Sequence, residues 1–288
     1  MSDGASPGYL ERTFSSQDGL RLYFRDYGDP ESAATPVLCL PGVTRNSKDF
    51  ADLAQRLAPE RRVICHDYRG RGRSAYDPDW RRYIARNYVD DVRHLLVAAG
   101  VHRVHVIGTS LGGILAMAMA VAMPTALAGV VLNDIGPEVG RDGLARIITY
   151  MRDDTPLGDW DAVVDHIRKA FPHLPARSPE DWLTIARNTY REAPDGRLVH
   201  DWDDAIVRQF ERGLRGRADL WPLFRALGRV PVLAVRGALS TVLSEETFAR
   251  MAKEMPVMTQ VTVDDCGHPA GLNEPHVLEA IDAHLRRA

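Results

Sequence analysis

A serine hydroxyl lies between two glycines in the segment Gly108-Thr109-Ser110-Leu111-Gly112. A strand-like run, 104–107, comes directly before it and a helical pattern follows, which is the setting that gives G-x-S-x-G a chemical meaning. Such a turn has room only for small residues and lifts the hydroxyl above the sheet. It also points a helix N-terminus at the reaction centre, where backbone N–H groups can hold a developing oxyanion. The pattern predicts that Ser110 is a nucleophile and that the Leu111 N–H is an oxyanion donor.

A serine hydroxyl is a poor nucleophile until a neighbouring base takes its proton, and the chain has ten histidines. His268 follows the last strand-like run, in a short loop that leads to the carboxyl edge of the predicted sheet. Ligands bind at that edge in open α/β sheets, so we expect His268 to be the base. We expect His105 to be packed within a strand. Four other histidines lie in or beside helical segments and are expected on solvated faces: His94, His102, His166 and His284. Spacing alone does not exclude the remaining four as the base: His66, His173, His200 and His276.

A second loop is expected at the same edge. The run 37–40 is strand-like, and Pro41-Gly42-Val43-Thr44-Arg45 follows it. A loop in this place can present a backbone N–H to a substrate carbonyl, and we expect Val43 to be that donor beside Leu111. Since the backbone supplies the bond, the side chain at this position is only weakly constrained.

These residues need a scaffold that brings several loops to one edge. The chain has 288 residues, 45 % of them hydrophobic, which suits one large α/β domain. The alternation in 21–25 after the turn pair Asp18-Gly19 predicts an antiparallel hairpin. Short apolar runs then recur with helical segments between them, at 37–40, 63–65, 104–107, 130–132, 232–235 and 259–263. This rhythm predicts a mostly parallel central sheet with helices on both faces.

The rhythm breaks between about Pro137 and Leu220. No convincing strand is visible there, and apolar residues recur at helical spacing in 160–170, 179–190 and 203–212. We interpret this stretch as a helical insertion that lies over the sheet. The predicted organisation is a core of residues 1–136 and 221–288 with a helical cap of residues 137–220.

Taken together, these segments resemble the α/β-hydrolase superfamily, in particular its capped esterase-like members. The resemblance runs through most of the predicted core, at 39–46, 66–74, 108–113, 131–137, 236–240 and 267–269. It implies that the serine attacks an acyl carbonyl, that the histidine shuttles the proton, and that water hydrolyses the acyl-enzyme. It also implies that no metal or organic cofactor is needed. Many relatives carry His-Gly where this chain has Pro41-Gly42, a change that need not disturb the backbone donor.

A second departure concerns the acid that supports the histidine. Family members commonly carry a Gly-x-x-Ser-Asp pattern after the strand that corresponds to 232–235, and here that register reads Gly237-Ala238-Leu239-Ser240-Thr241. Three interpretations stay open. Asp134, at the end of the 130–132 run, can supply the carboxylate, as in some superfamily members. The hydroxyl of Thr241 or Ser240 can orient the ring without charge. Alternatively, the chain is an altered or inactivated form.

Composition bears on the other function classes. The formal net charge of -3 gives no electrostatic reason to expect a nucleic-acid or anionic-membrane partner. Arg69-Gly70-Arg71-Gly72-Arg73 is therefore interpreted as a structural loop near the active-site edge. The chain's three cysteines form no disulfide or metal pattern. Because the N-terminus lacks an apolar export signal, a cytoplasmic location is expected. Self-association into a homo-oligomer is left open.

Three functional hypotheses follow. The first is a serine hydrolase that acts on a small carboxylic ester or lactone. The second is an enzyme of the same fold that cleaves a different bond, as carbon–carbon hydrolases, amidases and cofactor-free lyases do. The third is a ligand-binding protein that retains the pocket with little chemistry, and Thr241 is its only support in the sequence.

Overall fold

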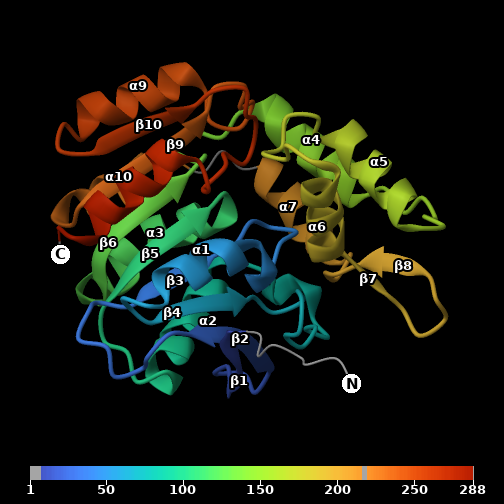
Figure 1. The fold of residues 1–288 in the computed structure, drawn as a ribbon, viewed down its shortest axis with the longest axis horizontal. Coiled ribbons are helices and arrows are strands. Elements are labelled where there is room, and N and C mark those ends of the chain that lie inside the picture. The colour runs from blue at the N-terminus through green and yellow to red at the C-terminus, as the bar shows by residue number, and fades with distance from the viewer. Residues whose placement is uncertain (1–7, 216–218, 288) are drawn as a thin grey trace.

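A single twisted sheet organises the molecule (Figure 1). The computed structural model describes residues 8–215 and 219–287. Eight strands lie in the order β1 (Tyr9–Ser15), β2 (Arg21–Tyr27), β4 (Val63–Asp67), β3 (Val37–Leu40), β5 (Val104–Thr109), β6 (Leu127–Asn133), β9 (Val232–Gly237) and β10 (Thr259–Val263). Strand β2 pairs antiparallel with β1 and β4, and every pairing from β4 to β10 is parallel. The predicted hairpin and the mostly parallel sheet are therefore confirmed.

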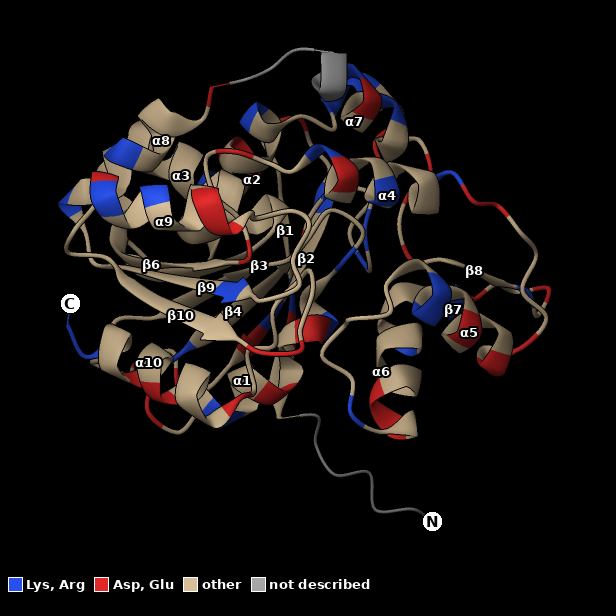
Figure 2. Cartoon of the chain, turned by 90° about the horizontal axis from the view of Figure 1, so that it is seen from above, with Lys and Arg blue, Asp and Glu red and all other residues tan. Residues whose placement is uncertain are grey.

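Helices cover both faces of this sheet, as the edge-on view in Figure 2 shows. One face carries α1 (Ala51–Leu57) and α10 (Pro275–Leu285), and the other carries α2 (Ala85–Ala98), α3 (Leu111–Ala122), α8 (Trp221–Ala226) and α9 (Glu245–Glu254). The middle strands β3, β5 and β6 are buried along their whole length, because both of their faces are covered. Their carboxyl ends carry the loops that the sequence assigns to the site.

The stretch between β6 and α8 lies to one side of the sheet, beside the carboxyl ends of the strands (Figure 1). It contains α4 (Arg141–Met151), α5 (Trp160–Ala170), α6 (Pro179–Thr189) and α7 (Ile206–Arg215). The expectation of no strand was wrong: β7 (Tyr190–Glu192) and β8 (Leu198–His200) form a two-stranded antiparallel sheet. Three residues each are too few to show the alternation that identifies a strand in sequence.

None of the described helices combines the length and the apolar character needed to span a bilayer.

Candidate active site

The turn between β5 and α3 holds Ser110 in an unusual backbone conformation. Its φ is 53° and its ψ is -114°, a region that residues with a side chain rarely occupy. The neighbouring glycines make the turn sterically feasible. A Cβ on Gly108 would lie 2.5 Å from the backbone of Gly112, and one on Gly112 would lie 2.0 Å from the Leu40 carbonyl oxygen. The spacing of small residues read from the sequence thus has a direct steric cause.

The structure brings Ser110, His268 and Asp134 together. The Nε2 atom of His268 lies 2.9 Å from Ser110 Oγ, and its Nδ1 atom lies 2.8 Å from Asp134 Oδ2. The serine side chain makes no capping bond to α3, so its oxygen is free to face the imidazole. One line of hydrogen bonds therefore runs from a carboxylate through an imidazole to a hydroxyl, although the three residues come from distant parts of the chain.

Asp134 is rigidly held at the end of β6. It is fully buried, its backbone has a φ of 55°, and its N–H donates to the Val235 carbonyl at 2.8 Å. Its second carboxylate oxygen, Oδ1, accepts a hydrogen bond from the Gly237 N–H at 3.0 Å. Both oxygens thus have partners, one on the imidazole and one on the neighbouring strand β9. This arrangement fixes the orientation of the carboxylate toward His268.

The alternative hydroxyls make no hydrogen bond to the imidazole. Thr241 is exposed, and its side chain makes no hydrogen bond to His268 or to any other described residue. The Ser240 Oγ accepts hydrogen bonds from the N–H groups of Val242 and Leu243, each at 3.2 Å. Of the candidates for the supporting group, only Asp134 contacts the imidazole.

The loop after β3 lies against the serine turn. A Cβ on Gly42 would be 3.7 Å from the Cβ of Ser110, and the Gly112 N–H donates to the Pro41 carbonyl at 3.1 Å. The N–H groups of Val43 and Leu111 make no hydrogen bond within the described chain. Two free backbone donors are therefore present, one in the loop after β3 and one at the first residue of α3, as oxyanion binding requires.

The carbonyl groups of this loop are held by side chains from the loop that follows β4. Tyr68 Oη donates to the Pro41 carbonyl at 3.1 Å, and Arg71 Nε donates to the Val43 carbonyl. Arg71 is completely buried and also donates to the Arg69 carbonyl and to Tyr88 Oη. No carboxylate of the described residues forms an ion pair with it. Burying an unpaired charge costs free energy, and the hydrogen bonds of Arg71 to these carbonyl and hydroxyl groups offset part of that cost.

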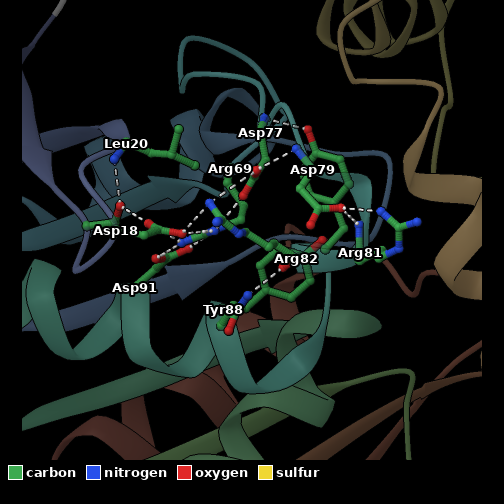
Figure 3. A network of polar contacts seen from close by, with 12 residues as sticks. Asp18, Leu20, Arg69, Asp77, Asp79, Arg81, Arg82, Tyr88 and Asp91 are labelled. Atoms are coloured by element: carbon green, nitrogen blue, oxygen red, sulfur yellow. Dashed lines mark hydrogen bonds and ion pairs between the residues drawn. The ribbon is translucent and has the colours of Figure 1, made fainter.

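Arg69 anchors the base of the same loop (Figure 3). Its guanidinium forms ion pairs with three carboxylates, Asp18 at 2.8 Å, Asp77 at 2.8 Å and Asp91 at 2.6 Å. Its hydrogen bonds lower the pKa of Asp18 to about 2, whereas burial raises the pKa of Asp91 to about 6. The structural interpretation of the arginine-rich loop is therefore confirmed.

A cavity of about 260 Å³ adjoins His268. It lies between α4 and the 171–174 segment on one side and the loops 239–242 and 267–268 on the other. Its polar lining residues are Arg146, His173, Thr241 and His268, and no Asp or Glu belongs to its wall. Apolar side chains, among them Ile147 and Phe171, complete it. Arg146 was not predictable from the sequence, because a single exposed arginine on a helix carries no distinguishing signal.

The other histidines differ partly from expectation. His105 is buried, as expected, but His284 is also buried and packs against it with the ring centres 5.7 Å apart, so its predicted solvated position was wrong. The helical pattern of 275–285 does not reveal that the last turn lies on the sheet. In the described parts of the chain, no three His, Cys, Asp or Glu side chains are grouped as a metal site would require.

Known hydrolases resemble this chain in sequence along most of its length. Residues 37–281 match the model of the Alpha/beta hydrolase family. The chain is 29 % identical over 264 residues to the 3-hydroxybutyrate-oligomer hydrolase of Cupriavidus necator, covering 88 % of this chain and 89 % of that protein. It is also 29 % identical over 247 residues to the 2-(acetamidomethylene)succinate hydrolase of Mesorhizobium japonicum, covering 85 % and 86 % of the two chains.

Solved structures show the same fold. An alpha/beta hydrolase from Novosphingobium aromaticivorans superimposes with a TM-score of 0.92 at 41 % identity, covering 99 % of this chain and 100 % of the other. The structure of E-2-(acetamidomethylene)succinate hydrolase superimposes with a TM-score of 0.83 at 27 % identity, covering 96 % and 99 %.

Proposed function

Because the chain belongs to the alpha/beta hydrolase family, we propose that it is a serine hydrolase that cleaves a small carboxylic ester or lactone through an acyl-enzyme. The observation that carries the proposal is the line of hydrogen bonds from Asp134 through His268 to Ser110. The names of the two relatives support hydrolysis in general, and the first is the hydrolase of an oligomer of a hydroxy acid.

In the first half of the reaction, His268 Nε2 takes the proton of Ser110 Oγ while that oxygen attacks the ester carbonyl carbon. The carbonyl oxygen becomes an oxyanion, which the N–H groups of Val43 and Leu111 bind. The carbon–oxygen bond to the leaving alcohol then breaks, and the imidazolium returns the proton to the alcohol oxygen. An acyl-enzyme on Ser110 remains.

In the second half, His268 takes a proton from a water molecule, whose oxygen attacks the acyl carbon. The bond to Ser110 Oγ breaks and the proton goes to that oxygen, which restores the serine and releases a carboxylic acid. Asp134 holds the imidazole in the tautomer with hydrogen on Nδ1 and stabilises the imidazolium that forms in both halves. We also propose that residues 137–220 act as a cap, since α4 and the 171–174 segment form walls of the cavity beside His268.

Replacing the nucleophile tests the proposal. The wild-type protein and Ser110→Ala are compared on p-nitrophenyl acetate and on a panel of short esters and lactones, with matched melting temperatures as the control for folding. We expect Ser110→Ala to lose turnover by several orders of magnitude. Equal rates for the two proteins would remove the proposal. If the protein turned over an amide or a vinylogous diketone but no ester, the bond that it cleaves would be an amide or carbon–carbon bond and not an ester.

A further inference from the structure

The cavity beside His268 has a defined place relative to the reacting atoms. His268 lines it, whereas Ser110 and the two proposed oxyanion donors, Val43 and Leu111, do not. In the proposed reaction, which is the premise of this inference, the carbonyl oxygen of the substrate faces the backbone donors. The leaving oxygen faces the imidazole that protonates it. A substrate group that is bonded to the leaving oxygen would, in this reaction, lie toward the cavity that His268 lines.

The charge of this cavity is positive. Arg146 of α4 is the one arginine in its lining, and it forms no ion pair or side-chain hydrogen bond with any described residue. Asp142, one helical turn earlier, is not paired with it. Arg45, which follows the Gly42 loop, is by contrast paired with Asp49 at 2.6 Å. Arg146, which is exposed, thus contributes an unpaired planar set of donors to the lining of a space that has no carboxylate in its wall.

The change at residue 241 contributes to the same property. Thr241 lines this cavity, in the register where family members commonly carry the acid. An aspartate in its place would put a negative charge within the wall. Asp134, which contacts His268 instead, is fully buried and does not line the cavity. With the acid at residue 134 and a threonine at residue 241, an anionic group in the cavity meets no acidic side chain.

We propose that Arg146 binds a carboxylate on the alcohol part of the substrate, so that the substrate is an ester of a short hydroxy acid. A guanidinium binds a carboxylate with two parallel hydrogen bonds, and this geometry is specific for a planar anion. The apolar lining, including Ile147 and Phe171, accommodates the short carbon chain between the carboxylate and the ester oxygen. The leaving group is then a hydroxy acid, protonated at its hydroxyl oxygen by His268.

Matched substrates test this assignment. The O-acetyl ester of a short hydroxy acid is compared with its neutral carboxamide and with a hemisuccinate ester of a neutral alcohol, which carries the charge on the acyl part instead. We expect kcat/KM to be about tenfold or more higher for the acetylated hydroxy acid than for the carboxamide, the size of one charge-assisted contact. Arg146→Gln is expected to remove this preference. Arg141→Gln changes an exposed arginine of the same helix that does not line the cavity and is expected to keep it.

Two further measurements separate failure of this inference from failure of the proposed function. Binding of the free hydroxy acid to Ser110→Ala is measured by calorimetry, and both Arg146→Gln and Thr241→Asp in that background are expected to weaken it about tenfold. Equal hydrolysis of the acid and the amide, or a preference for the hemisuccinate, would overturn the inference while leaving a serine hydrolase. If the wild type hydrolyses no ester, the proposed function fails, and absent binding of the hydroxy acid would then overturn the inference as well.

Discussion

At the scale of single residues, the contact between Asp134 and His268 was the least predictable feature of the proposed site. Two loops, one after β6 and one after β9, end close to the imidazole, and either can carry a carboxylate. The sequence places a threonine in one and an aspartate in the other, but it does not reveal which loop contacts the ring. The sequence indicated that Ser110 and His268 would lie together, as they do in the structure, because each has a local signal, a steric one at the turn and a positional one after the last strand. The acid has no such local signal.

Removing the charge of Asp134 is predicted to cost activity without changing the fold. For Asp134→Asn we expect kcat to fall about 10³- to 10⁴-fold. The imidazole loses the carboxylate that holds it in the tautomer with hydrogen on Nδ1, and the imidazolium loses its counter-charge. Steady-state kinetics on a neutral ester give the measurement.

The matched variant is Thr241→Asp in both the wild-type and the Asp134→Asn backgrounds. Since Thr241 does not contact His268 in the structure, we expect the added carboxylate to raise kcat by less than tenfold. A hundredfold recovery in the double variant would mean that the loop after β9 can support the histidine and that the assignment of Asp134 is incomplete.

At the scale of elements, the loop after β4 supports the loop that carries Val43. Arg71 donates to the Val43 carbonyl, and its guanidinium lies 5.3 Å and 5.0 Å from the ring centres of Tyr68 and Tyr88. Holding the carbonyl also fixes the adjoining backbone, including the N–H that is to bind the oxyanion. The sequence predicted that this segment is structural, but not which of its arginines contacts the Val43 loop.

Arg71→Met is predicted to lower kcat about tenfold with little change in KM. The reason is that the Val43 donor remains present but is less well placed, whereas losing an oxyanion donor outright costs about 10²- to 10³-fold. Arg71→Lys keeps the charge and is expected to recover part of the loss. Arg73→Met is the control, because the Arg73 side chain is 58 % exposed and packs over Tyr23. An Arg71→Met enzyme with wild-type kcat would exclude a positioning role.

At the scale of the whole molecule, two buried histidines link the C-terminal helix to the sheet. Burial lowers the pKa of His105 and of His284 to about 4, and the nearby His284 lowers that of His105 further. The ordinary value is near 6.5, so the unfolded chain binds more protons between these values. Stability from this pair is therefore fully present above about pH 6.5 and is lost as the pH falls toward 4.

Urea unfolding between pH 7 and pH 4.5 measures this effect. The free energy of unfolding is expected to fall by about 2–3 kcal/mol per histidine as the pair is forced to take up protons. His284→Leu replaces the histidine with a side chain of similar size that cannot ionise. Its free energy of unfolding is expected to fall clearly less over the same pH range. An identical pH dependence in wild type and variant would show that other groups, such as the buried His66, account for the loss.

The layered core was predictable because each buried strand leaves its own apolar run in the sequence. Helices in the stretch between β6 and α8 were predictable from their apolar spacing, but its two short strands and the position of α4 were not. Those features depend on contacts with distant loops, such as the hydrogen bond from the Gly267 N–H to the His173 carbonyl at 2.7 Å. The cavity and its unpaired arginine arise from the same long-range packing.

Covalent labelling of Ser110 tests the account most directly. The wild type, Ser110→Ala and His268→Ala are each treated with an alkyl fluorophosphonate, and intact mass is followed with time, with peptide mapping of the adduct. If His268 activates Ser110, we expect one adduct per wild-type chain, located on Ser110, no adduct on Ser110→Ala, and labelling of His268→Ala slowed by orders of magnitude. A wild-type protein that stays unlabelled, or an adduct that forms equally fast without His268, would contradict it.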